Sequence, residues 1–352
     1  MSLPFLQPYF GLSNSLQTAQ ASAGGGGVGG WVELGRTTLG SAASTITVSS
    51  LTNKRYYKFL FDQTAGQSGS ADPFIRCNAD TGSNYSDRVS DTGGADATTT
   101  SQTKGRIGGH PAGTTGNFGV GYISNYSTKE KLVICHEVGQ STAGAGTAPY
   151  RAEAVAKWAN TADAINSISV SSGATWNTGT ELVVLGWDPA DTHTTNFWTE
   201  LASVNGTGSS TNISSGTITA KKYLWIQMWN KTGAVSYSNM TFNNITTGIY
   251  AGRTSEGGGA DGTTLSQTAF AIPPNANHGH FFNIFIINNS ANEKLGIFSS
   301  LTASSTGAGL APERSEGVLK WANTSAQITE IDMNSSSGNY TSDSILKVWG
   351  SN

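Results

Sequence analysis

Two related stretches of the sequence decide between helix and strand for much of the chain. One reads APYRAEAVAKWANT at residues 148–161, and the other reads APERSEGVLKWANT at residues 311–324. The first stretch alone is compatible with a helix, because alanine favours helices. The second carries Gly317, which is unfavourable inside a helix and acceptable in a strand. We therefore expect a β-strand that ends at the tryptophan in both stretches.

The similarity between these stretches extends through most of the chain. Further motifs recur in the same order at a spacing of roughly 165 residues. They are Trp31-Val-Glu-Leu34 with Trp198-Thr-Glu-Leu201, Lys54-Arg-Tyr56 with Lys221-Lys-Tyr223, Gly93-Gly-Ala-Asp96 with Gly258-Gly-Ala-Asp261, Ser101-Gln-Thr103 with Ser266-Gln-Thr268, and Glu130-Lys-Leu132 with Glu293-Lys-Leu295. A period this long indicates a duplicated domain, since solenoid units have roughly 20–50 residues. We expect one domain at residues 31–190 and a second copy at residues 196–352.

The composition indicates an all-β protein. Charged residues make up 12% of the chain, about half of the usual roughly 25%, and 44 residues are glycine. Such a composition excludes a coiled coil, a helical bundle and a charge-rich disordered chain. We expect two tandem jelly-roll-like β-sandwich domains of about eight strands each, separated by turn clusters and preceded by an extended N-terminal arm.

Charge and hydropathy exclude several classes of partner. A net charge of −3 argues against nucleic acid, which requires a basic face. No apolar run reaches the roughly 18–20 residues that span a bilayer, so we expect no membrane partner. The first basic residue is Arg36, so the amino terminus lacks the positive region of a signal peptide. Only Cys77 and Cys135 occur, which leaves one disulfide bridge open and forms no zinc site.

The first 30 residues differ from both repeats. Residues 1–12 are apolar and aromatic with two prolines, and a Gly-rich linker follows at residues 19–30. The side chains expected to dock onto a partner are Leu3, Phe5, Leu6, Tyr9, Phe10 and Leu12. The alternative is a strand packed on the chain's own first domain.

One aligned pair of strands, residues 56–62 and 223–229, indicates a second candidate site. Side chains alternate across a strand, and one face is apolar in both copies. These core positions are Tyr57, Phe59 and Phe61 in the first copy and Leu224, Ile226 and Met228 in the second. The opposite face changes from Lys58, Leu60 and Asp62 to Trp225, Gln227 and Trp229. The two tryptophans suit a sugar-stacking platform or a protein interface, and the alternative is packing against a loop or the first domain.

Metal sites and catalytic groups are sparse. His278 and His280 have the only metal-like spacing, and on a strand both rings would lie on one face. No carboxylate lies close to them in the sequence, and they follow a Pro-Pro loop signal, so we expect no metal and no cofactor.

The repeated Gly-Gly-Ala-Asp motif has two interpretations. It is either a calcium loop that uses Asp91, Asp96 and Asp261, or a turn with glycine at positive φ. The second copy replaces Asp91 with Glu256, which favours the turn. Nor do the acidic pairs Asp87/Asp91 and Asp188/Asp191, at expected turns, indicate the paired carboxylates of a glycoside hydrolase, so we expect no enzyme.

The order of the motifs resembles a known group of proteins. The run Asn78-Ala-Asp-Thr-Gly-Ser-Asn-Tyr-Ser86, then Gly-Gly-Ala-Asp, Ser-Gln-Thr and Lys-Trp-Ala-Asn-Thr, is similar to β-rich domains of tailed-phage structural proteins, especially marine and cyanobacterial ones. The resemblance covers both copies but not the first 30 residues, and it implies a non-enzymatic virion protein. The expected role is capsid decoration (cement) or head fibre, and the alternative is a tail fibre, collar or receptor-binding protein that recognises host surface carbohydrate.

This resemblance also implies partners and a location. The expected partners are the major capsid protein or other virion proteins, with a host glycan as the alternative. It further implies a homo-oligomer, with a trimer favoured, located in the virion after synthesis in the host cytoplasm.

Overall fold

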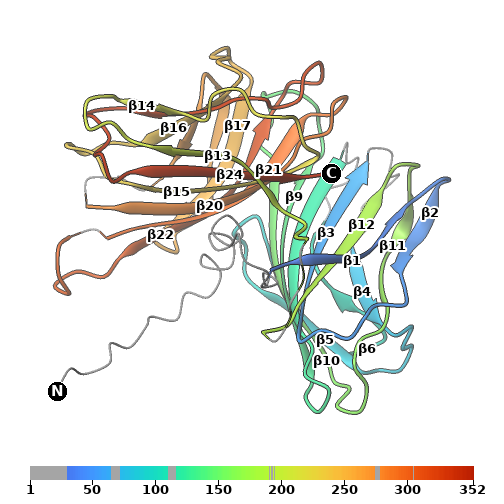
Figure 1. Ribbon diagram of the computed structural model, residues 1–352. Helices are drawn as coiled ribbons and strands as arrows, with labels where there is room; N and C mark the ends of the chain where they lie inside the picture. The colour runs from blue at the N-terminus through green and yellow to red at the C-terminus, as the bar shows by residue number, and fades with distance from the viewer. Residues whose placement is uncertain are drawn as a thin grey trace, which may run out of the picture.

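The computed structural model describes residues 30–64, 72–109, 116–189, 191, 193, 195–273, 278–303 and 305–352. Within these ranges every regular element is a β-strand, so the all-β prediction is confirmed. The chain forms two halves, coloured blue to yellow-green and yellow to red in Figure 1. All six side chains of the predicted docking arm lie outside the described residues.

Twelve strands are described in each half. In the first half they are β1 (Val32–Thr38), β2 (Ala43–Val48), β3 (Tyr56–Thr64), β4 (Phe74–Cys77), β5 (Tyr85–Asp91), β6 (Ala97–Gln102), β7 (Gly105–Arg106), β8 (Gly116–Ser124), β9 (Lys131–Gln140), β10 (Tyr150–Trp158), β11 (Ile168–Trp176) and β12 (Glu181–Trp187). In the second half they are β13 (Thr199–Asn205), β14 (Asn212–Ser214), β15 (Tyr223–Asn230), β16 (Ser238–Phe242), β17 (Tyr250–Glu256), β18 (Gly262–Gln267), β19 (Phe270–Ile272), β20 (His280–Ile287), β21 (Lys294–Thr302), β22 (Glu313–Trp321), β23 (Ile331–Ser335) and β24 (Ile345–Ser351).

The same sheet topology occurs in both halves. The first half has a large sheet of order β1-β12-β3-β8-β9-β10-β5-β6 and a small sheet of order β2-β11-β4-β7. The second half has β13-β24-β15-β20-β21-β22-β17-β18 and β14-β23-β16-β19, which is the first order with twelve added to every strand number. The ladders are antiparallel, and the two sheet pairs indicate two domains.

In each half the small sheet packs face to face on the large sheet, which makes the architecture β-sandwich-like. The alternation expected for residues 56–62 and 223–229 is confirmed, because its apolar face lies in the core of each half. The strands expected before the two tryptophans are also confirmed as β10 and β22, which end at Trp158 and Trp321.

The expectation of about eight strands for each copy was too low. One missed strand is β6, with the sequence ATTTSQ, and all of its residues are exposed. It carries no large apolar side chain, so its sequence shows no period-two hydrophobic signal. Such a strand is held by its ladder to β5, which is a tertiary feature of the sheet edge.

Two of the repeated motifs have the same structural role in both halves. Lys131 donates to the carbonyl of Asn160 at 2.9 Å, and Lys294 donates to the carbonyl of Asn323 at 2.8 Å. The asparagine side chains in turn accept backbone N–H groups of the following turn. The Glu-Lys-Leu and Lys-Trp-Ala-Asn-Thr motifs therefore join the start of one strand to the end of the next.

Both cysteines are free thiols buried in the core of the first half. Burial raises the pKa of Cys77 to about 12 and raises the pKa of Cys135 well above its usual value. Both thiols are therefore protonated at neutral pH. Separately, no helix that could cross a bilayer is present in the described ranges.

Candidate functional site on the outer faces of the large sheets

We call the side of each large sheet that is turned away from its own small sheet its outer face. These outer faces contain both the contact between the two halves and the largest groups of exposed apolar residues described below. The two large sheets contact each other through these faces, chiefly β8 and β9 against β20 and β21. Figure 1 shows β9 of the first half beside β21 of the second. One apolar cluster spans the contact. The first half contributes Leu60, Phe118, Val120, Val138, Val183 and Leu185, and the second contributes Phe197, Trp198, Tyr223, Trp225, Phe285, Ile287, Leu295, Ile297, Val318 and Trp349.

A buried lysine lies at the centre of this contact. The Nζ atom of Lys58 is 3.6 Å from the ring centroid of Phe285 and 5.1 to 5.6 Å from those of Tyr122, Trp198 and Trp225. Burial lowers the pKa of Lys58 well below its usual value, and the ring faces partly compensate the cost of burying the ammonium. These contacts between Lys58 and the aromatic rings hold β3 against the second half.

Ion pairs hold both ends of the contact. At one end, Arg151 on β10 forms a two-pronged pair with Asp261 of the β17–β18 turn, at 2.6 and 3.3 Å. At the other end, Lys222 contacts Asp62 at 2.9 Å and Glu181 at 3.0 Å. Burial opposes ionisation of Glu181, but the Lys222 ammonium and hydrogen bonds to the carboxylate hold its pKa below the usual value.

The loop between β9 and β10 also docks on the second half. The backbone N–H of Gly144 donates to the Glu293 carboxylate at 2.5 Å. The carbonyl of Ala145 accepts the backbone N–H of Ser266 at 3.0 Å. These bonds satisfy backbone groups that the contact would otherwise bury unpaired.

The described residues cover only part of each outer face, and the part of the first half that they leave exposed is apolar. Tyr122, Leu132, Ile134 and Val155 are all exposed large side chains on β8, β9 and β10. Ile134 is opposite both Tyr122 and Val155 in the ladders, so these side chains form one continuous row across the sheet. We refer to these four residues as the first open face.

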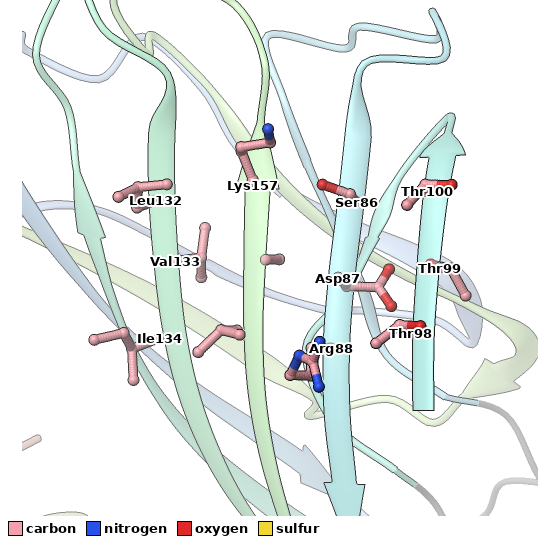
Figure 2. A pocket seen from close by; sticks show the side chains of 12 residues that line it. Ser86, Asp87, Arg88, Thr98, Thr99, Thr100, Leu132, Val133, Ile134 and Lys157 are labelled. Carbon is pink, nitrogen blue, oxygen red and sulfur yellow. The ribbon is translucent and has the colours of Figure 1, made fainter. Parts of the chain in front are cut away.

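A hollow of about 460 Å³ lies along the first open face (Figure 2). Its lining residues come from β5, β6, β9 and β10. They are Ser86, Asp87, Arg88, Thr98, Thr99, Thr100, Leu132, Val133, Ile134, Val155, Ala156 and Lys157. Exposed ion pairs stand at its rim, Arg88 with Asp96 at 3.0 Å and Lys157 with Glu130 at 3.2 Å. An apolar centre with a charged rim suits a protein partner better than a small substrate.

The second half has an uncovered stretch at a different level of its sheet. Phe281 and Leu301 are exposed, Trp229 is half-buried, and the three residues are opposite one another on β15, β20 and β21. We refer to these three residues as the second open face. A smaller hollow of about 120 Å³ lies where the two halves meet and is lined by residues of both sheets.

The predicted tryptophan face is divided between two environments. Trp225 is buried, with its ring 4.7 Å from Trp349 and stacked on Phe285 at 5.7 Å. A sugar cannot stack on a ring covered in this way, and Trp225 instead packs between the halves. Gln227 is half-buried and donates to Asn283.

The two histidines do not share a face. His278 is exposed in a turn and β20 begins at His280, which is buried, so the two residues do not lie on one strand. Burial lowers the pKa of His280 to about 4, which makes it neutral at pH 7. Among the described residues no group of three or more His, Cys, Asp or Glu side chains could hold a metal ion.

The Gly-Gly-Ala-Asp motif forms the turn after β5 and after β17. Gly93 and Gly258 have φ of 73° and 78°, as the turn interpretation requires. The carboxylates that a calcium loop would use are engaged by arginines, Asp91 by Arg106 at 2.7 Å and Asp261 by Arg151. These contacts leave the turn as the interpretation that the geometry supports.

Sequence reasoning missed the first open face. A signal was present, because four consecutive residues are apolar, namely Leu132, Val133, Ile134 and Cys135. Such a run places apolar side chains on both faces of the strand. A strand that is apolar on both faces is expected where both faces of the sheet are covered. At Leu132 and Ile134 no described residue of this chain covers the outward face.

Comparisons with known proteins do not identify the chain. No protein family and no curated protein matches the sequence. Domains LG4-5 of the mouse laminin alpha1 chain share 9% identity over 91% of each chain, with a TM-score of 0.17. Neisserial surface protein A shares 6% identity over 80% of this chain and 99% of its own, with a TM-score of 0.15. At these scores neither likeness supports an inference about function.

Proposed function

We propose that this chain is a non-enzymatic structural protein of a tailed-phage virion, with capsid decoration or head fibre as its role. The observation that carries the proposal is the first open face, a row of exposed apolar side chains on a rigid sheet with ion pairs at its rim. Such contiguous apolar surface on a soluble fold marks a protein-binding site.

Two further features support this role. The motif order resembles domains of tailed-phage structural proteins, and a surface poor in charge and rich in hydroxyls suits close packing in a lattice. Strands within each half alternate between the large and the small sheet, as in β1, β2, β3 and β4. We therefore propose that the halves are tandem jelly-roll-like domains, at residues 31–190 and 196–352, that present their open faces to neighbouring proteins.

We also propose that residues 1–30 act as a docking arm for the particle. Deletion of these residues should leave the thermal melting of the protein unchanged, because the strands of both sandwiches begin at Val32 or later. The same deletion should abolish binding to purified particles. Loss of cooperative melting in the truncated chain would contradict the proposed domain boundaries.

Analysis of purified particles tests the main proposal. Mass spectrometry should detect the chain at a copy number comparable to other structural proteins. Electron cryo-microscopy should then show two packed β-sandwiches on the particle. Absence of the chain from purified particles would refute a virion role.

A receptor-binding role is the second candidate. It is favoured by the adjacent rings of Trp229 and Phe281 on the second open face, since aromatic rings bind sugars by stacking. A glycan array probed with the wild type and with Trp229→Ala separates the two roles. A sugar signal that disappears in the variant would support receptor binding, and the absence of any signal would contradict it.

A further inference from the structure

The two halves can be compared position by position, because topology and motifs repeat. Lys131 and Lys294 make the same hydrogen bond at the start of β9 and β21, so these strands align without ambiguity. Trp158 and Trp321 end β10 and β22 in the same way, and each is opposite that lysine in its ladder. Every outward position of the first large sheet therefore has an equivalent in the second.

We call a row of residues that are opposite one another on neighbouring strands a level of the sheet. On the first of two levels, equivalent positions of the two halves have opposite exposure. Ile134 is 53% exposed whereas its equivalent Ile297 is 6% exposed, and Val155 is 47% exposed whereas Val318 is 1% exposed. The same reversal holds for Leu132 with Leu295 and for Tyr122 with Phe285. In the second half this level is the one that packs on the first half.

The reversal runs the other way on the second level. Phe118 and Val138 are buried in the contact, whereas their equivalents Phe281 and Leu301 are exposed. The contact between the halves is thus heterologous, because the first half uses Phe118 and Val138 whereas the second half leaves their equivalents exposed; only Lys58, which is opposite Tyr122, contacts the same level of the second half, at Phe285. On β8, β9 and β10 and on their equivalents β20, β21 and β22, each half leaves exposed the positions whose equivalents the other half buries. On the remaining strands, Lys58 and Leu185 are buried in the contact together with their equivalents Trp225 and Trp349.

We propose that the two open faces bind a second copy of this chain, with the first open face of one copy against the second open face of its neighbour. The residues on each side are apolar, and most match in type the equivalents that already pack together within the chain. The same residue type recurs in four of the pairs, Leu132/Leu295, Ile134/Ile297, Val155/Val318 and Phe281/Phe118. Tyr122 and Leu301 stay apolar against Phe285 and Val138, and Trp229 replaces Asp62, so the free faces are at least as apolar as the buried ones.

The charged groups around the contact are duplicated as well. Within the chain, Arg151 pairs with Asp261, and their equivalents Arg314 and Asp96 are both exposed at the open faces. Between copies, Arg314 is expected to pair with Asp96. This ion pair between Arg314 of one copy and Asp96 of the other would fix the position of the docked copy along the sheet.

The docking loop repeats in the same manner. The Gly144-Ala-Gly146 segment that binds Glu293 recurs as Gly307-Ala-Gly309, which is exposed on the second half. The equivalent of Glu293 is Glu130, exposed at the rim of the first open face. Between copies, the Glu130 carboxylate of one copy can therefore accept the backbone N–H of Gly307 of the other, as Glu293 accepts that of Gly144 within the chain.

This inference deepens the proposed function by naming the partner of the open faces, and it rests on that proposal only for their protein-docking role. The rotation between copies decides whether the assembly closes into a ring or continues as a filament. In either case the contact is head to tail, so the two sides of every interface carry different residues.

Two charged substitutions test the pairing with the full-length chain. Ile134→Glu blocks the first open face and Leu301→Glu blocks the second, and both side chains are exposed, so we expect each variant to fold, which its thermal melting checks. Native mass spectrometry and light scattering should show oligomers for the wild type. Each variant alone should lose association by at least about tenfold. The matched control Val235→Glu, at an exposed apolar residue outside both faces, should assemble as the wild type does.

Mixing the two variants gives the decisive result. Each retains one intact face, so an equimolar mixture should form a one-to-one heterodimer and no longer species. A mixture that stays monomeric while the wild type assembles would overturn the head-to-tail pairing. A monomeric wild type would also overturn it, including the case in which residues 1–29 cover the faces. Neither result affects the virion proposal, which fails only if the chain is absent from particles.

Discussion

The pair Ile297 and Ile134 offers a sharp prediction about how the halves pack. Both are isoleucines on equivalent strands, β21 and β9, with backbone ladders on both sides. Ile297 is 6% exposed within the contact between the halves, and Ile134 is 53% exposed on the first open face. We expect the substitution of each by alanine to have different effects on the free energy of unfolding.

The magnitude follows from the exposed fractions. An isoleucine-to-alanine change removes three carbon groups, which at about 0.8 kcal/mol each correspond to about 2.4 kcal/mol for a fully buried side chain. Ile297 loses nearly all of this and leaves a cavity, so its cost should lie in the range of about 2–5 kcal/mol. Ile134 is about half buried and opens no closed cavity, so its cost should be about 1 kcal/mol.

Equilibrium unfolding in urea, followed by tryptophan fluorescence, measures both values. Protein concentration should be low, because self-association would stabilise the folded chain by mass action. The difference between the two variants should be at least about 1 kcal/mol. Equal costs for Ile297→Ala and Ile134→Ala would mean that the halves do not pack through these levels, and would refute the reasoning.

Three further predictions concern buried polar groups. Burial lowers the pKa of His280 to about 4, so between about pH 6.5 and 4 the unfolded state binds more protons than the folded state. The free energy of unfolding should therefore decrease by about 3 kcal/mol as the pH is lowered from about 6.5 to about 4. Unfolding of His280→Phe as a function of pH should lack this component, and an unchanged profile would contradict it. The change Asp261→Asn removes one of the two carboxylates that pair with Arg151, the other being Glu153, and should cost about 2 kcal/mol in urea unfolding, whereas a cost below about 1 kcal/mol would show that the pair is solvated. Cys77 and Cys135 should resist thiol reagents in the native protein and both react after denaturation, and fast labelling under native conditions would show that the core opens.

The strand pattern and the inward faces could be predicted from the sequence. A strand places alternate residues on opposite faces, so the apolar residues of 56–62 and 223–229 indicate their core side without any knowledge of the partner sheet. The duplication adds a second reading of each strand, which decided between helix and strand at residues 150–158. These are local properties, and the structure confirms them.

The candidate site could be predicted only in part. The sequence indicated that the face of Trp225 and Trp229 differs from the core, and it could not tell that Trp225 is buried while Trp229 stays half-buried. The strand β6 was missed because it has no apolar residues. Both outcomes depend on which surfaces meet at long sequence separation.

The sequence by itself determined the repeat, through its recurring motifs. It also determined the strands that carry apolar residues and their inward side, because these follow from the period of side chains along a single strand. The tertiary structure alone decided which outward residues are covered. Leu132 and Leu295 have the same type and the same strand position, yet the first is exposed and the second is buried. No local pattern can distinguish them, because the difference arises from a heterologous contact in which each half offers a different level of the same face.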